Sequence, residues 1–356
     1  MTDPSTAWIP VLTGQKVGDY ALGRCLGRGG FGLVFEATND ATKASVAVKV
    51  LTPTTDTDAV IDFDNEGVLL RKLNTCKGVI NFVDGGTQVL QLHGPGGVPI
   101  PIEIRFHVLT LASGTLEELL LDPVARNQLS WEERLRLWRW AVKSLMQMHG
   151  ASVAHRDLKA SNCLLMVQGN VTRVRFADLG RAKDLSLGAV RDPQTYLTGR
   201  GDFRFASPEA LLFQGGVTPD DFLAADYYGL GSLLVEITTG QSMTTLAIGD
   251  IHALMAQGFA DHQAGVQRDI NGLGLRYRTV VSEVIALMPP SIRDDARAVL
   301  TSLCHPNPAE RLAQTPYSKD RASREKLAWI LRRVDIMIRR IEIDARDARR
   351  RERVSA

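Results

Sequence analysis

The sequence contains no long apolar segment, which argues against a chain that crosses a membrane. No run approaches the ~18 uncharged apolar residues of a membrane-spanning helix. The first residues, MTDPSTAWIPVLTG, also lack the basic start and continuous apolar stretch of a signal peptide. We therefore expect neither membrane insertion nor secretion.

Cysteine is scarce, and its spacing excludes two classes of small-domain stabilisation. The 4 cysteines lie far apart without a CxxC pair. This argues against a disulfide framework and against a thiolate zinc site. We expect free thiols in a reducing environment and predict a cytoplasmic location.

Neither sign of charge is in large excess, since 42 basic and 40 acidic groups leave a net charge of +2. Residues 321–356 hold 12 Lys/Arg and 6 Asp/Glu, whereas residues 1–320 hold 30 and 34. A basic tail can attract phosphates, but its mixed signs are typical of a solvated helix face, so no nucleic-acid partner is expected. Only 10 basic residues are lysine, which suggests a GC-rich genome and a bacterial source.

Internal repeats and low-complexity segments are also lacking, and 44% apolar composition indicates a folded globular protein. From Tyr20 to Leu111, short β-rich runs punctuated by glycine predict a small, mostly antiparallel sheet. A helix over 58–73 interrupts them. Its residues at helical spacing are Ile61, Asn65, Val68 and Leu69.

The pattern becomes mainly helical after Gly114. Ser130 can cap a helix, with Glu133 three residues later, and further helices are predicted around 220–240, 279–288 and 294–304. A last helix, over about 324–346, carries the apolar stripe Leu327, Ile330, Leu331, Val334, Met337, Ile338 and Ile341. We expect this stripe to pack on the rest of the chain or on a second copy, so self-association is one prediction.

A glycine-rich segment, G-x-G-x-x-G, begins the residues that carry chemistry. Gly27, Gly29 and Gly32 lie between two strand-like runs and do not open a helix. This context argues against a dinucleotide-binding fold. Glycine lets backbone N–H groups approach phosphate oxygens closely. The alternative is a tight hairpin without a ligand.

Two charged residues follow at equal intervals. Lys49 lies in a β-branched run, on the face of Ala47, and Glu66 comes 17 residues later in the predicted helix. A strand lysine often only protects a sheet edge, and a helix glutamate often only faces solvent. An ion pair between them would instead fix the ammonium where it can hold phosphates.

The segment from Ala154 to Leu165 contains an acid, a base and an amide within six residues: Asp157, Lys159 and Asn162. These groups can accept a proton, offset phosphate charge and bind a metal through oxygen. Asp178 follows 16 residues after Asn162, before Gly180, and could hold Mg²⁺. An isolated D-x-G is usually only a turn.

In this order the motifs resemble those of eukaryotic-type (Hanks-type) serine/threonine protein kinases, from about Tyr20 to Leu312. The resemblance implies an α+β, bilobal fold with a β-rich N-lobe and a mainly helical C-lobe. The implied divisions are an N-terminal extension at 1–19, the N-lobe at 20–111, the C-lobe at 112–320 and a basic C-terminal helix at 321–356.

By the same resemblance the site residues acquire roles. Gly27, Gly29 and Gly32 match the phosphate-binding loop, Lys49 and Glu66 its lysine–glutamate pair, Asp157 and Lys159 the catalytic loop, and Asn162 and Asp178 the Mg²⁺ ligands. Adenine would lie between Val34, Ala47 and Leu164, with Leu109 as gatekeeper and the backbone of Thr110 and Ala112 as partners. Apolar residues at these places also suit a plain core.

Further matches are structural. Glu209 would pair with Arg311, and Asp226 would brace the catalytic loop. Leu179 and Ser207 replace the usual Phe and Ala. Asp202 replaces the usual threonine, and we expect it to pair with Lys159.

The resemblance implies ATP and Mg²⁺ as cofactors, a protein substrate and transfer of the γ-phosphate to serine or threonine. Thr198, with Thr195 and Tyr196 beside it, is a candidate phosphorylation site that Arg156 would bind. Two alternatives stay open. A pseudokinase scaffold would bind ATP without transfer, and a small-molecule kinase normally lacks Lys159 and the Pro208-Glu209 segment.

Overall fold

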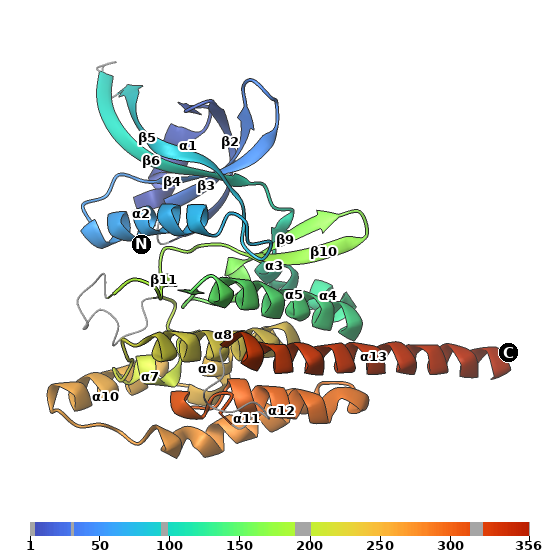
Figure 1. Cartoon of the computed structure of the whole chain (residues 1–356). Coiled ribbons are helices and arrows are strands. Elements are labelled where there is room, and N and C mark those ends of the chain that lie inside the picture. The colour runs from blue at the N-terminus through green and yellow to red at the C-terminus, as the bar shows by residue number, and fades with distance from the viewer. Residues whose placement is uncertain (1–3, 30–31, 94–98, 189–200, 314–322, 356) are drawn as a thin grey trace. The chain divides into compact units, whose positions relative to one another are not determined.

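The computed structural model describes residues 4–29, 32–93, 99–188, 201–313 and 323–355 (Figure 1). The chain divides into two compact units. The first comprises Met1–Ser113 with Ala177–Ala182, and the second comprises Gly114–Phe176 with Lys183–Ala356. The first is built around a sheet and the second is mainly helical, which confirms the predicted α+β class.

The first unit contains a six-stranded antiparallel sheet in the order β1-β2-β3-β4-β6-β5. Its elements are β1 (Lys16–Val17), β2 (Tyr20–Gly29), β3 (Gly32–Asn39), β4 (Ser45–Leu51), β5 (Phe82–His93) and β6 (Pro99–Thr110), with η1 (Pro4–Ala7), α1 (Trp8–Leu12) and α2 (Thr57–Lys72). Side chains of a strand alternate between faces. One face therefore carries Phe35, Val48 and Val108, all fully buried against α1 residue Leu12.

The opposite face carries polar residues among the apolar ones. Lys49 lies opposite Val34 in the β3–β4 pair and opposite His107 in the β4–β6 pair, while Ala47 lies opposite Leu109. Residues directly opposite each other share a face. All five side chains therefore lie on one face of the sheet, where Lys49 meets a side chain of α2.

Helix α2 agrees closely with the predicted helix over 58–73, but of the four residues noted for their helical spacing only Leu69 is buried. Ile61 is 46% exposed and Val68 is 60% exposed, whereas Phe63 and Glu66 are each 1% exposed. The helix is oriented by a buried ion pair and by aromatic packing, which a count of apolar residues cannot detect. Asp56 caps its first turn by accepting the N–H groups of Asp58 and Ala59.

The second unit surrounds two long helices, α5 (Trp131–Gly150) and α8 (Pro219–Thr239). Ser130 and Glu133 form the predicted capping box of α5. The other helices are α3 (Leu116–Leu121), α4 (Pro123–Gln128), α7 (Pro208–Leu211), α9 (Met243–Ile248), α10 (Ile251–Gln263), α11 (Gly274–Ala286), α12 (Arg293–Leu303) and α13 (Ser323–Ser355), with η3 (Ala160–Asn162), η4 (Ile270–Leu273), η5 (Pro290–Ile292) and η6 (Pro308–Glu310). Short strands complete it: β7 (Gly114–Thr115), β8 (Val153–Ala154), β9 (Cys163–Gln168), β10 (Val171–Phe176) and β11 (Lys183–Asp184).

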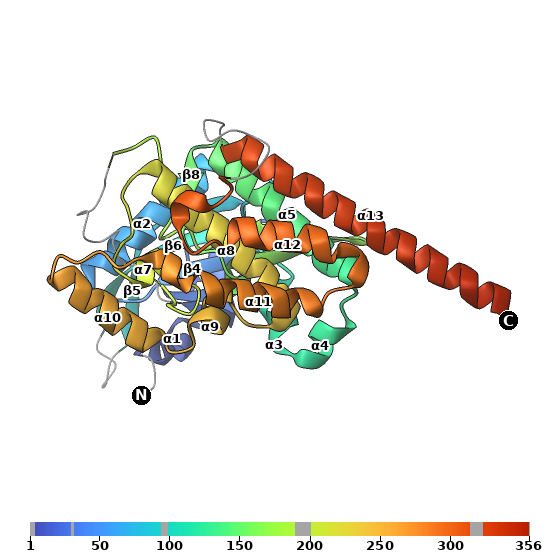
Figure 2. The same ribbon diagram turned by 90° about the horizontal axis from the view of Figure 1, so that it is seen from below.

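Helix α13 runs beside α5 in both views, and its C-terminal end extends past the other helices of the second unit (Figures 1 and 2). Leu327, Ile330, Val334 and Met337 are fully buried. Ion pairs join the two helices, with Arg139 Nε at 2.5 Å from an Asp335 carboxylate oxygen. The chain itself thus covers the stripe, as one of the two expectations held. Burial of the stripe does not require a second copy of the chain, which was the other expectation.

Candidate active site

A buried lysine is the centre of the predicted site in the first unit. Lys49 Nζ lies 2.6 Å from Glu66 Oε2 and 2.9 Å from Asp178 Oδ1. Burial disfavours the ammonium, but the negative charges of Asp178 and Glu66 outweigh it, so the pKa of Lys49 lies above its ordinary value. The lysine is therefore a fixed cation, as the predicted pair with Glu66 requires.

Residues 177–182 are attached to the first unit by α2. Asn65 Nδ2 donates to the carbonyl oxygens of Gly180 at 3.1 Å and of Ala182 at 3.0 Å. Asp178 has a backbone φ of +60°, in the left-handed region that a non-glycine residue seldom adopts. Such backbone persists only where the surroundings fix it, and it is concentrated at functional sites. Asn65 was noted in the sequence only for its spacing, so this contact was not predicted.

The glycine-rich segment forms the predicted hairpin, in which Gly29 lies opposite Gly32 across β2 and β3. Gly32 has a φ of +127°, and a Cβ there would lie 2.0 Å from the carbonyl oxygen of Val50. Any other residue at this position would clash with the backbone of β4. At Gly27 and Gly29 a Cβ would meet no atom within 4 Å. These two glycines therefore leave the hairpin backbone uncovered, as close approach of a phosphate would need.

Three of the residues predicted to contact adenine lie on β4 and β6, namely Ala47, Leu109 and Thr110. Ala47 and Leu109 are 8% and 6% exposed. The N–H of Thr110 donates to the carbonyl oxygen of Asn81 at 3.1 Å. Because this N–H is already used, the Thr110 carbonyl is the backbone group that fits the adenine prediction. Ala112 follows the strand and is half-buried.

The second unit brings together the acid, the base and the amide of the predicted catalytic loop. Lys159 Nζ lies 3.1 Å from Asp157 Oδ2. Asn162 Nδ2 donates to the Asp157 carbonyl oxygen at 2.7 Å and to its Oδ2 at 3.1 Å. These bonds fix the Asp157 carboxylate between a cation and an amide. Leu164, predicted to contact adenine, is half-buried on β9 in this unit.

Asp226 on α8 braces this loop through hydrogen bonds, as predicted. Its carboxylate accepts the backbone N–H of His155 at 2.8 Å and of Arg156 at 2.6 Å, and it lies 2.8 Å from His149 Nε2. Arg156 has a φ of +64°. Two backbone hydrogen bonds to one buried carboxylate hold the strained residue that directly precedes Asp157.

A second predicted pair lies deep in the same unit. Arg311 donates two hydrogen bonds to the Glu209 carboxylate, at 2.7 Å and 2.6 Å, and one to the carbonyl oxygen of Ala224 at 3.0 Å. The fork of the guanidinium matches a carboxylate in this bidentate geometry. Arg311 thereby ties the segment at Ser207-Pro208-Glu209 to α8.

The predicted pairing of Asp202 with Lys159 is wrong. Asp202 instead accepts hydrogen bonds from Arg204, two from Nε at 2.9 Å and 3.0 Å and one from the backbone N–H at 3.1 Å. Burial raises the pKa of Asp202, but Arg204 outweighs it and lowers the pKa overall, with Lys159 adding only a weaker charge effect. Pairing with Arg204, two residues away, costs less conformational entropy than pairing with Lys159, which is distant in the sequence. Arg204 therefore forms the pair. Thr195, Tyr196 and Thr198 lie outside the described residues.

Magnesium prefers oxygen ligands, and each predicted ligand carries one in its own unit: Asp178 a carboxylate in the first and Asn162 an amide oxygen in the second. Asn162 uses its amide nitrogen toward Asp157. The Asn162 amide oxygen takes no part in these hydrogen bonds.

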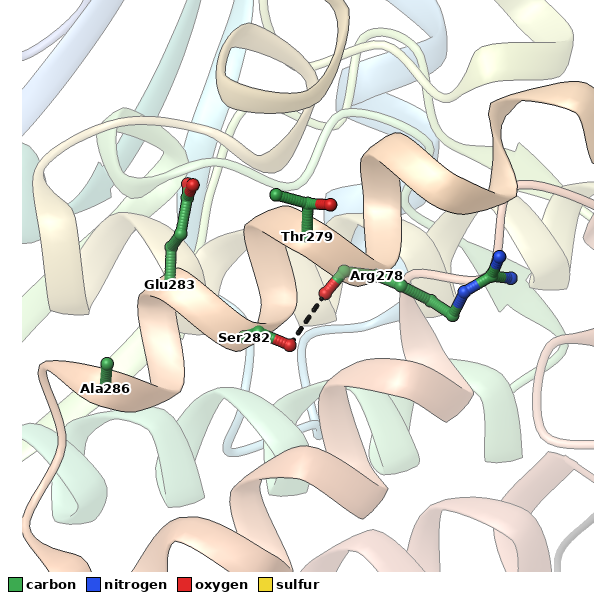
Figure 3. A pocket seen from close by; sticks show the side chains of 5 residues that line it. All are labelled: Arg278, Thr279, Ser282, Glu283 and Ala286. Atoms are coloured by element: carbon green, nitrogen blue, oxygen red, sulfur yellow. Dashed lines mark hydrogen bonds between the residues drawn. The ribbon is translucent and has the colours of Figure 1, made fainter.

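The second unit also contains a pocket on α11. It is lined by Arg278, Thr279, Ser282, Glu283 and Ala286 of α11 (Figure 3). None of these residues was predicted to act in the site. Across the described part of the chain, moreover, no helix combines the length and apolar character needed to cross a membrane.

Comparisons with known proteins identify the family of the chain. Residues 20–321 match the protein kinase domain family, so the chain belongs to the protein kinase family. It is 29% identical over 65% of its length to a G-type lectin S-receptor-like serine/threonine-protein kinase of Arabidopsis thaliana, of which the match covers 25%. It is 33% identical over 61% of its length to cysteine-rich receptor-like protein kinase 18 of Arabidopsis thaliana, covering 29% of it.

A third similar protein is a probable serine/threonine-protein kinase of Dictyostelium discoideum, 27% identical over 63% of the chain and covering 40% of that protein. The chain thus spans a quarter to two fifths of the length of these relatives.

Proposed function

We propose that the protein transfers the γ-phosphate of ATP to serine or threonine residues of protein substrates. The observation that carries the proposal is the buried contact of Lys49 with both Glu66 and Asp178. Burying the Lys49 ammonium against Glu66 costs desolvation energy, so the arrangement is better explained by a role in function than by a gain in stability. Phosphoryl transfer requires this kind of fixed positive charge.

Each residue of the proposed site has a separate role. Lys49 and the hairpin at Gly27, Gly29 and Gly32 would bind phosphate oxygens, with Glu66 keeping the ammonium in place. Asp157 would orient the acceptor hydroxyl and accept its proton, and Lys159 would offset charge on the transferred group. Asn162 and Asp178 would hold Mg²⁺, which supplies neutralisation of the phosphate charge when bound.

The serine/threonine preference, the protein substrate and the adenine contacts rest on the resemblance and on the names of the similar kinases. A lysine two residues after the catalytic-loop aspartate, as Lys159 follows Asp157, resembles the pattern of serine/threonine kinases. A cytoplasmic location and a bacterial source, favoured by composition alone, belong to the same proposal.

The test is incubation with radiolabelled ATP, a generic protein substrate and Mg²⁺, followed by phosphosite mapping. Lys49→Ala and Asp157→Asn should each lower transfer at least ~100-fold, the low end for a positioned acid–base group. Lys16 and Asp40 form an exposed pair at 2.6 Å. Lys16→Ala and Asp40→Asn are therefore matched controls and should leave transfer unchanged.

Wild-type-like turnover in Asp157→Asn would overturn the proposal. Binding of Mg²⁺-ATP without any transfer by the wild-type chain would favour the pseudokinase alternative instead. Label found on a small hydroxyl compound but never on protein would favour the small-molecule kinase.

A further inference from the structure

His107 is a buried imidazole beside the lysine of the proposed site. It lies on β6, directly opposite Lys49 in the β4–β6 pair, and is 6% exposed. Both side chains therefore lie on the same face of the sheet. Since Glu66 belongs to α2, the position of α2 on the sheet decides whether Glu66 reaches Lys49.

A single hydrogen bond joins the imidazole to the backbone of α2. His107 Nε2 lies 2.9 Å from the carbonyl oxygen of Phe63, and a carbonyl can only accept, so Nε2–H donates. The ring also stacks on the Phe63 side chain, with centroids 4.1 Å apart and planes 11° from parallel. Phe82 of β5 packs edge-on with a centroid distance of 6.0 Å.

Two glycines make the space that the imidazole fills. A Cβ at Gly67 of α2 would lie 2.6 Å from His107 Cε1, and a Cβ at Gly85 of β5 would lie 3.2 Å from its Nδ1. Glycine weakens the interior of a helix. Its presence at position 67 is explained by this close approach, because any larger residue would displace either α2 or the ring.

The imidazole is neutral near pH 7. The pKa of His107 is lowered to about 4, chiefly by burial and with a contribution from the positive charges of Lys49 and Arg71, while the Phe63 carbonyl and Asp64 oppose the shift. A neutral ring carries one N–H, and the Phe63 carbonyl fixes it on Nε2. Within the described ranges, Nδ1 has no hydrogen-bond partner.

We propose that His107 is a positioning residue for phosphoryl transfer, which fixes α2 on the sheet through Phe63 and thereby holds Glu66 against Lys49. Phe63 precedes Glu66 by three residues, or about one helical turn. The carbonyl that His107 binds and the carboxylate that Lys49 binds thus lie on the same side of the helix. The inference rests on the proposed function.

The first test compares donors at position 107. His107→Leu keeps an apolar side chain without a donor, whereas His107→Gln can place an amide N–H near the Nε2 position. We expect kcat/KM for ATP to fall about 2- to 10-fold in His107→Leu, as for one net hydrogen bond, and to recover in His107→Gln. Thermal denaturation confirms that each variant is folded.

A double-mutant cycle separates positioning from general stability. If His107 acts through Glu66, His107→Leu should cost no further activity in a Glu66→Gln background. Full additivity of the two changes would overturn the proposal. Equal kcat/KM for His107→Leu and wild type would also overturn it.

A second cycle uses the glycine of α2. Alanine is the better helix former, yet Gly67→Ala should lower kcat/KM because its methyl group meets the imidazole. The same change should cost nothing further in a His107→Ala background. Improved or unchanged activity in Gly67→Ala alone would contradict the close approach.

The imidazole contact can be measured without turnover. Long-range ¹H–¹⁵N NMR of the full chain should show the Nε2–H tautomer for His107 at pH 7, and an Nδ1–H tautomer would overturn the inference. If the wild-type chain transfers no phosphate, the proposed function fails, and the tautomer still tests the contact itself.

Discussion

Replacing Glu236 by glutamine should make the second unit more stable at alkaline pH. Glu236 lies near the end of α8, is 5% exposed, and accepts the N–H of Ala160 at 3.1 Å. Burial raises the pKa of Glu236 to about 7, and the carboxylate of Glu117 contributes to this rise. The Ala160 N–H and the charges of Lys159 and Arg204 oppose it without cancelling it.

The sign follows from proton binding. Between pH 4.5 and about 7 the folded chain holds a proton on Glu236 that the unfolded chain has released. Stability therefore falls as pH rises through this window and stays constant above it. At about 1.36 kcal/mol for each tenfold change in proton affinity, the gap corresponds to roughly 3 kcal/mol. Glutamine does not titrate and should abolish the loss.

The assay is denaturant unfolding of wild type and Glu236→Gln between pH 5 and 8.5. The stability advantage of the variant should grow with pH and reach roughly 3 kcal/mol at pH 8. Glu283→Gln, an exposed change on α11, is the control and should follow wild type at every pH. Parallel curves for wild type and Glu236→Gln would refute the reasoning.

Other perturbations test separate contacts. Arg311→Met leaves the buried Glu209 carboxylate unpaired and should cost about 3–5 kcal/mol in denaturant unfolding, with a much smaller loss when Glu209→Gln is added. Deletion of residues 323–355 should uncover the surface of α5 and α12 against which the apolar stripe of α13 packs, and so increase dye binding and aggregation; an equally stable, monomeric product would contradict this. Asp202→Ala and Arg204→Ala should lower transfer to a protein substrate by similar, non-additive factors while KM for ATP stays constant; independent effects would refute the pair.

Much of the local structure was predictable because it depends on neighbours in the sequence. The capping residue Ser130 marked the start of α5, and the flanking strand pattern showed that the glycines open a hairpin. The predicted helix over 58–73 is α2, Thr57–Lys72. Helix α10, in contrast, was not predicted. Among its residues only Gly258 is buried, although Ile251, Leu254, Met255 and Phe259 have helical spacing in the sequence.

The tail shows a limit of apolar periodicity as a measure of length. The stripe ends at Ile341, and the predicted helix ended soon afterwards, yet α13 continues to Ser355. Residues 342–353 are mostly arginine, glutamate, aspartate and alanine. Arginine, glutamate and alanine favour helix without burial, and Arg353 lies in the last turn, where a cation is favoured by the helix dipole.

The residues of the candidate site could be proposed from the sequence, but the contacts that orient them could not. Lys49, Glu66 and Asp178 are recognised by type and spacing. Asn65 and His107 act through backbone carbonyls, which every residue possesses, so no residue type in the sequence marks their partners. Only the register of β4 and β6 puts His107 beside Lys49.

Asp202 shows why charge alone does not identify a partner. Position relative to the catalytic loop suggested Lys159, but Lys159 is already 3.1 Å from Asp157, and Arg204 is two residues from Asp202. A long-range pair requires the loop to be ordered first, whereas an i to i+2 pair orders the loop itself. The carboxylate here stabilises the turn that holds Arg204, and a threonine could not replace that bidentate contact. Asp202→Thr should therefore behave like Asp202→Ala toward a protein substrate.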